Sequence, residues 1–262
     1  MYPYELFWGI DLYSIFLLAG VLAAFLIFRI CADRRKFTAR LQNFILFDGF
    51  LSVVAGYLGA VLAQAVFDYW KTGVFSLDKN TGATFLGGLI AGTAVFFVVY
   101  FGAGALVFKK HENEHLRKFP DLLSIGGGCI AVAHALGRIG CFFAGCCYGK
   151  PTDSVFGIHL VGMDHKTIPV QLMESAFLFV LFGVILFFNL KKERFLFGMP
   201  VYMVSYGIWR YFAEFLRDDD RGEFFIKIFT PSQFTSILLV VGGVALFLIL
   251  YNKYYGRKKV KG

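Results

Sequence analysis

The sequence predicts an all-α membrane protein with seven transmembrane helices, and this expectation rests on composition, apolar segments and loop charge. Of the 262 residues, 58% are hydrophobic and 19% are aromatic, and the mean hydropathy is +0.65. Charged residues make up 17% of the chain, whereas a soluble domain usually carries about 25%. Because the sequence has no internal repeat and no low-complexity linker, we expect one polytopic membrane domain over residues 1–262.

Seven apolar segments are long enough, or nearly long enough, to cross a bilayer as helices of about 20 residues. They span residues 10–30, 44–67, 84–108, 122–146, 170–190, 196–216 and 234–251. The fourth segment is the weakest candidate of the seven, because it contains several glycines together with His134 and Arg138.

Lys and Arg gather in every second connection between these segments, and such an excess is typical of cytoplasmic loops. They cluster after the first, third, fifth and seventh segments, whereas residues 1–9 contain neither Lys nor Arg. We therefore expect the N-terminus outside and the C-terminus in the cytoplasm. The same loops explain the formal net charge of +8, and because the charges form no single stripe we expect no nucleic-acid partner.

The stretch from residue 134 to residue 150 carries polar side chains where a lipid-facing helix would carry Leu or Val. It contains His134, Arg138, the cysteines Cys141, Cys146 and Cys147, and four glycines. An arginine near the middle of a bilayer costs roughly 2.5–3.5 kcal/mol on insertion scales, so it needs a partner or a function. We expect this stretch to line a polar cavity in which Arg138 faces an anionic group.

The expected topology brings further polar residues to the depth of Arg138, near the outer leaflet. Gln171 and Glu174 begin the fifth segment, and Arg217 ends the sixth. These side chains are expected to converge on one site. The alternative is that each of them extends independently to the lipid headgroups, which is common near helix ends.

The sixth segment carries a second ordered pattern. Tyr206, Arg210, Glu214 and Arg217 are spaced by four, four and three residues, which places them on one helix face. Arg210 and Glu214 are expected to form an ion pair, and we expect this pair to have a structural role in the assembly of the helices. Arg217, at the open end of the helix, is the better candidate for binding a substrate anion.

Four motifs, in this order along the chain, resemble the prolipoprotein diacylglyceryl transferase family. The first is Gly137-Arg138-Ile139-Gly140 with Phe142, Gly145 and Gly149, and the second is Pro169-Val170-Gln171-Leu172 with Glu174. The third is Tyr206-Gly207 with Arg210, Glu214, Phe215 and Arg217, and the fourth is Ser232-Gln233 followed by Gly242-Gly243. The resemblance covers most of the chain and includes the family's seven-span architecture with the N-terminus outside.

The resemblance implies transfer of diacylglyceryl from phosphatidylglycerol to the thiol of a lipobox cysteine, a step of lipoprotein maturation in a bacterial inner (plasma) membrane. Arg138 would hold the lipid phosphate, and Arg217 would stabilise the departing phosphate. Gln171 and Glu174 would position the glycerol head or the peptide. Tyr206, Arg210 and Glu214 would complete the substrate site. No cofactor is expected.

Two other functions fit the same residues. One is a paralogous membrane enzyme with a different acceptor or a different thiol chemistry. The other is a transporter of lipids or small anions with an arginine-lined cavity. Such transporters often contain paired repeats with broken helices, and the sequence shows none.

The chain departs from the family pattern at residues that matter for the chemistry. Leu86 stands where the family has a histidine before Gly-Gly, and Cys141 and Cys146 replace an asparagine and an acidic residue. Tyr57 stands where the family has an arginine. A base for the acceptor thiol is therefore unassigned. His134, one turn before Arg138, is expected to serve as this base, and a packing role for it is the alternative.

The five cysteines fall into two groups. Cys31 and Cys129 have the surroundings of ordinary small apolar residues. For Cys141, Cys146 and Cys147 three interpretations stay open: structural packing, a disulfide or reactive thiol, and a metal site completed by His134. We expect no metal, because C-x4-C-C matches no common zinc spacing.

Overall fold

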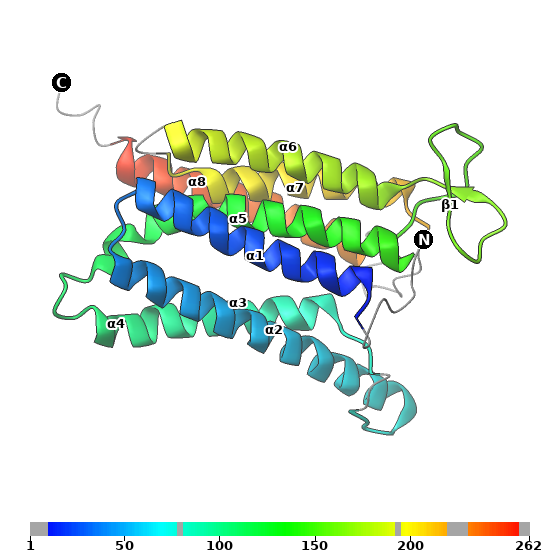
Figure 1. Ribbon diagram of the computed structural model, residues 1–262, viewed down its shortest axis with the longest axis horizontal. Coiled ribbons are helices and arrows are strands. Elements are labelled where there is room, and N and C mark those ends of the chain that lie inside the picture. The colour runs from blue at the N-terminus through cyan, green and yellow to red at the C-terminus, as the bar shows by residue number, and fades with distance from the viewer. Residues whose placement is uncertain (1–9, 78–80, 192–194, 219–229, 257–262) are drawn as a thin grey trace. The chain divides into compact units, whose positions relative to one another are not determined.

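A computed structural model describes residues 10–77, 81–191, 195–218 and 230–256, and these are almost entirely helical (Figure 1). The chain divides into two compact units. One is Lys36–Phe119, and the other combines Met1–Arg35 with Pro120–Gly262. The two units are described separately, and the single membrane domain expected over residues 1–262 stays a prediction.

The smaller unit is built around two closely packed helices. It contains α2 (Ala39–Thr72), α3 (Phe85–Val98), the π-helical turn η1 (Val99–Ala103), α4 (Gly104–Val107) and the first turns of α5 (Glu114–Ala144). A Cβ atom added at Gly87 would lie 2.9 Å from the carbonyl oxygen of Gly59. These glycines therefore let α2 and α3 approach backbone to backbone, as small residues do in membrane helix pairs.

The larger unit is a helix bundle whose consecutive helices alternate in direction (Figure 1). Its elements are α1 (Leu12–Arg34), the rest of α5, the hairpin strands β1 (Ile158–His159) and β2 (Lys166–Thr167), α6 (Val170–Lys191), α7 (Gly198–Ala213), the 3₁₀ turn η2 (Glu214–Leu216) and α8 (Pro231–Tyr254). Its core consists of the buried residues Ala131, Ala135, Leu178, Leu181, Ile185, Tyr202 and Tyr206. Three helices, α5, α6 and α7, thus supply the core.

One end of this bundle is held together by a buried arginine. The guanidinium of Arg35 donates to Asp121 Oδ1 at 2.7 Å, to Asn189 Oδ1 at 3.1 Å and to the carbonyl oxygen of Phe195 at 2.9 Å. We call Arg35 and these three partners the Arg35 cluster. It joins the end of α1 to the beginning of α5 in this unit, to the end of α6 and to the residues that precede α7.

Six helices among the described residues are long and apolar enough to cross a membrane. They are Leu12–Arg34, Ala39–Thr72, Phe85–Val107, Glu114–Ala144, Val170–Lys191 and Pro231–Tyr254. The remaining expected segment, 196–216, forms the 16-residue α7 and the turn η2. The protein is therefore an all-helical, multi-pass membrane protein. The count of seven and the orientation of the termini stay predictions.

Candidate active site

The polar residues expected to converge lie at the other end of the larger unit, away from the Arg35 cluster. This end is formed by the end of α5, the beginning of α6, the end of α7 and the beginning of α8. Because consecutive helices run in opposite directions, residues far apart in sequence meet there.

Glu174 is the centre of the first group of side chains. It is fully buried on the first turns of α6. Its Oε2 lies 3.0 Å from Nε of Arg138, and its Oε1 accepts a hydrogen bond of 2.8 Å from the Tyr206 hydroxyl. The same Oε1 lies 3.8 Å from Nε2 of His134. Glu174, Arg138, Tyr206 and His134 form what we call the carboxylate cluster.

His134 is held by aromatic residues of α7. Its Nδ1 lies 3.1 Å from the hydroxyl oxygen of Tyr202, and its ring meets the ring of Tyr206 edge to face at 4.7 Å. Tyr202 was not among the residues singled out from the sequence. The spacing of four residues to Tyr206 could have indicated it, because it places both tyrosines on one face of α7.

Arg210 and Glu214 form the ion pair that their spacing predicts. Nη2 of Arg210 lies 2.7 Å from Oε2 of Glu214 and donates to Ser232 Oγ at 2.7 Å. Thr230, the N-cap of α8, donates to the other carboxylate oxygen of Glu214 at 2.8 Å. These bonds fasten the end of α7 to the beginning of α8. A role in substrate binding for Arg210 and Glu214 stays a prediction.

Arg217 is brought to the site by the loop that follows α5. Gly149 pairs with Arg217 in an antiparallel bridge, and the amide of Lys150 donates to the carbonyl oxygen of Leu216 at 2.9 Å. A Cβ atom at Gly149 would lie only 2.7 Å from that same oxygen, so the close pairing requires glycine. Arg217 is 6% exposed, beside the thiol of Cys147.

Gln171 forms a hydrogen bond to the loop that contains Cys146 and Cys147. Its Nε2 donates to the carbonyl oxygen of Cys146 at 2.6 Å, and the residue is 1% exposed. Its Oε1 is buried and has no hydrogen-bond partner within the described part of the chain. Gln171 therefore positions the loop and still offers one buried acceptor.

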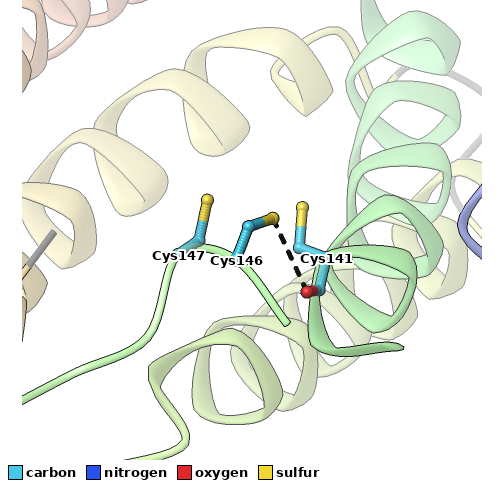
Figure 2. Close-up of side chains that lie close together, drawn as sticks. All are labelled: Cys141, Cys146 and Cys147. Carbon is cyan, nitrogen blue, oxygen red and sulfur yellow. Dashed lines mark hydrogen bonds between the residues drawn. The ribbon is translucent and has the colours of Figure 1, made fainter. Parts of the chain in front are cut away.

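Three cysteine thiols lie together where this loop leaves α5 (Figure 2). The Sγ atoms of Cys141, Cys146 and Cys147 all lie within 4.8 Å of one another, and Cys146 Sγ is 3.6 Å from the carbonyl oxygen of Cys141. We call them the thiol cluster. Gly145 and Cys147 both adopt positive φ angles, of 73° and 63°, which fold the loop back toward α5.

Positive charge surrounds the thiol cluster. Arg138 interacts electrostatically with Cys141 and Cys147, and Arg217 interacts with Cys147. Hydrogen bonds with the two neighbouring thiols, and secondarily the Arg217 guanidinium, lower the pKa of the Cys147 thiol, although burial opposes this. The pKa of Cys146 is raised, first by its hydrogen bonds to the other two thiols. The three thiols therefore differ in acidity, with the pKa of Cys147 lowered and that of Cys146 raised.

Comparison with known proteins identifies the family. The sequence model described as prolipoprotein diacylglyceryl transferase matches residues 4–249. The chain belongs to the prolipoprotein diacylglyceryl transferase family. The resemblance drawn from the four motifs is thereby confirmed, and so is the expectation of a membrane transferase.

Several curated relatives align with this chain over most of their own length. A phosphatidylglycerol–prolipoprotein diacylglyceryl transferase 2 of Clostridium perfringens is 32% identical, over 80% of this chain and 79% of its own. A phosphatidylglycerol–prolipoprotein diacylglyceryl transferase of Finegoldia magna is 30% identical, over 94% and 93%. One of Clostridium tetani is 28% identical, over 94% and 96%.

Proposed function

We propose that this family member moves the diacylglyceryl group of phosphatidylglycerol to the thiol of a lipobox cysteine in a prolipoprotein. The relatives' names and the family support the lipid and the acceptor. The observation that carries the proposal for this chain is Arg138, which is largely buried and fixed by fully buried Glu174 at the end of a membrane helix bundle. Such an arginine is prepared to bind a lipid phosphate.

The reaction is a substitution at carbon. The acceptor sulfur bonds to the terminal glycerol carbon of the diacylglyceryl group, and the bond from that carbon to the phosphate oxygen breaks. The electron pair goes to that oxygen, so glycerol phosphate leaves with one negative charge more than the lipid phosphate carried. Guanidinium groups placed beforehand around this phosphate stabilise the transition state more than the substrate.

The proposed roles follow from this charge development. Arg138, oriented by Glu174, holds the lipid phosphate, and Arg217 stabilises the phosphate that departs. The Arg210–Glu214 pair, with Ser232, keeps the end of α7 in place and thereby sets the position of Arg217. Gln171 and Tyr206 position the glycerol head or the peptide.

His134 is the proposed acceptor of the thiol proton. Its Nε2 faces Glu174, and its Nδ1 is held by the hydroxyl of Tyr202. A carboxylate beside the ring stabilises the imidazolium that forms when the base takes a proton. In this arrangement Tyr202 orients the ring.

The proposal includes the membrane and the topology. The chain would lie in a bacterial plasma membrane as one domain with seven spans, α7 with η2 being the shortest, and with the N-terminus outside. The unbroken alternation of basic and non-basic loops supports the orientation. A C-terminal reporter that is active only outside the cytoplasm would contradict it.

Transfer can be measured directly with purified protein in vesicles. With phosphatidylglycerol vesicles and a lipobox peptide, the mass of the peptide should increase by one diacylglyceryl group. Vesicles of phosphatidylcholine, or a peptide with serine in place of the acceptor cysteine, should give no product. The Clostridium perfringens relative serves as the positive control. If that relative is active and this chain forms no product, the proposed function is wrong.

A further inference from the structure

The thiol cluster lies at the same end of the larger unit as the residues proposed for the reaction. Cys141 lies in the last turn of α5, and Cys146 and Cys147 follow in the loop after this helix. Their three sulfurs all lie within 4.8 Å of one another. They lie among the arginines assigned to the phosphate. The thiol cluster is therefore close enough to the proposed phosphate site to interact with the acceptor thiol of the substrate.

The spacing of the three sulfurs suits one metal ion. Zinc binds thiolate sulfur at about 2.3 Å, so three sulfurs around one zinc ion lie about 4 Å apart. The observed separations reach this value with side-chain shifts below about 1 Å. No histidine, aspartate or glutamate of the described residues joins the cluster, and His134 belongs to the carboxylate cluster instead. Three protein ligands leave a fourth position open, as in catalytic zinc sites.

Charge and loop geometry also suit a metal ion. Three thiolates with one divalent cation carry a net charge of −1, which the neighbouring Arg138 and Arg217 offset. The strained positive φ of Cys147 and the bond from Gln171 to the loop hold the sulfurs in place before any ion arrives. Gln171 also has a buried Oε1 that has no hydrogen-bond partner among the described residues.

We propose that Cys141, Cys146 and Cys147 bind a zinc ion whose open position takes the acceptor thiol of the substrate. The inference rests on the proposed function and replaces the expectation of no metal. That expectation relied on the C-x4-C-C spacing, which matches no common zinc motif. The fold of the loop nevertheless brings the three sulfurs within 4.8 Å of one another.

The zinc ion would activate the acceptor thiol by lowering its pKa. The acceptor thiol binds the metal and loses its proton, which His134 accepts; a thiol bound to zinc is deprotonated at neutral pH. The metal-bound sulfur then bonds to the glycerol carbon while the carbon–oxygen bond breaks and its electron pair goes to the phosphate oxygen. The thioether product binds zinc weakly because it carries no charge, and it leaves. Zinc is neither oxidised nor reduced.

Cobalt(II) is a spectroscopic probe for such a site. The full-length protein is purified in detergent, reduced, freed of metal with a chelator and titrated with Co²⁺ without oxygen. One equivalent should bind and produce thiolate-to-cobalt absorption, and one equivalent of Zn²⁺ should remove it. Cys141→Ser, Cys146→Ser and Cys147→Ser should each weaken Co²⁺ binding at least about 100-fold, since even changes outside the ligand set cost about 10–100-fold.

Two cysteines outside the cluster provide matched controls. Cys31→Ala and Cys129→Ala should bind Co²⁺ as the parent does, because both cysteines lie outside the group of three. Helicity and elution volume verify that each variant is folded. A parent protein that binds no Co²⁺, or whose reduced cysteines re-form a disulfide instead of binding it, overturns the metal site.

The lipobox peptide tests the open position. Added to the cobalt-loaded protein, the cysteine peptide should change the absorption spectrum, whereas the serine peptide should not. An unchanged spectrum with both peptides overturns the thiol-binding role.

Metal-free protein separates this inference from the proposed function. Its transfer rate should fall at least about 100-fold and return with Zn²⁺. Undiminished transfer without metal overturns the inference and leaves the proposed function intact. Cobalt binding with a response to the cysteine peptide, but without transfer by any form of the protein, contradicts the proposed function and leaves the thiol-binding metal site standing.

Discussion

Both ends of the larger unit contain arginines with little exposure, but these arginines differ in their surroundings. Among the described residues, Arg35 donates to the carboxylate of Asp121 and to two neutral acceptors from other parts of the unit. At the opposite end, Arg138 lies beside Glu174, Arg210 lies beside Glu214, and Arg217 lies beside the thiol of Cys147. Three arginines thus gather at the proposed site, whereas the Arg35 cluster contains one.

Burial alone therefore does not distinguish a structural arginine from a functional one. Arg35 and Arg217 are both 6% exposed, yet Arg35 lies in a network of hydrogen bonds that joins it to three other parts of the unit, and Arg217 lies beside a thiol of the proposed site. Under the proposed function, Arg138 and Arg217 stabilise a phosphate whose negative charge grows in the transition state. The difference between the two ends predicts different results for similar substitutions.

The largest effect on transfer is expected from the arginines assigned to the phosphate. Arg138→Ala and Arg217→Ala should each lower the transfer rate about 1000-fold, because each removes charge stabilisation that grows in the transition state. Arg138→Lys should restore little, because an ammonium cannot reproduce the planar fork of donors. Product formation in phosphatidylglycerol vesicles measures the transfer rate. Full activity of Arg138→Lys would mean that Arg138 contributes only its positive charge and not its donor geometry.

A somewhat smaller loss is expected at His134. His134→Ala and His134→Gln should both lower the transfer rate about 100-fold, since general bases commonly contribute 10²–10⁴-fold. Glutamine keeps a hydrogen-bonding group near Tyr202 but cannot accept a proton, so it separates the two roles of the ring. Single-turnover rates are the measurement, and parental activity of His134→Gln would assign the histidine to packing.

Gln171 should show a still smaller effect. Gln171→Ala removes the bond to the carbonyl oxygen of Cys146 and should lower the transfer rate about 10-fold, the equivalent of one hydrogen bond of about 1.4 kcal/mol. Gln171→Glu also loses the Nε2 donor, so its transfer rate should be no higher than that of Gln171→Ala. The comparison is made at saturating peptide, and no change in either variant would mean that the loop keeps its position without Gln171.

The smallest effect on transfer is expected at the Arg35 cluster. Arg35→Ala should leave the transfer rate per folded molecule nearly unchanged while lowering the free energy of unfolding by about 2–3 kcal/mol, because charged hydrogen bonds are lost. Denaturant titration in detergent measures the stability. If transfer is lost in protein that stays folded, the two ends of the unit are coupled and the distinction drawn between them is wrong.

Patterns local in sequence predicted particular contacts, whereas for residues distant in sequence only the shared end of the bundle was predicted and not the individual contacts. The Arg210–Glu214 pair follows from a spacing of four residues between α7 and the turn η2 that continues it, and the fifth expected segment, 170–190, nearly coincides with α6, Val170–Lys191. The second segment was expected over 44–67, whereas α2 begins at Ala39 because Thr38 caps it there. Hydropathy detects the apolar part of a helix and not the polar turns that extend it.

By itself the sequence determined the all-helical membrane class, the family and the polar residues that are candidates for the site, because periodicity, apolar length and motif order are properties of neighbouring residues. Only the tertiary structure decided which of those residues meet. That Glu174 receives Arg138, His134 and Tyr206 depends on how α5, α6 and α7 pack. That three cysteines form one cluster depends on two positive φ angles and on the bridge from Gly149 to Arg217. Such contacts arise from packing between helices, and a linear pattern does not contain them.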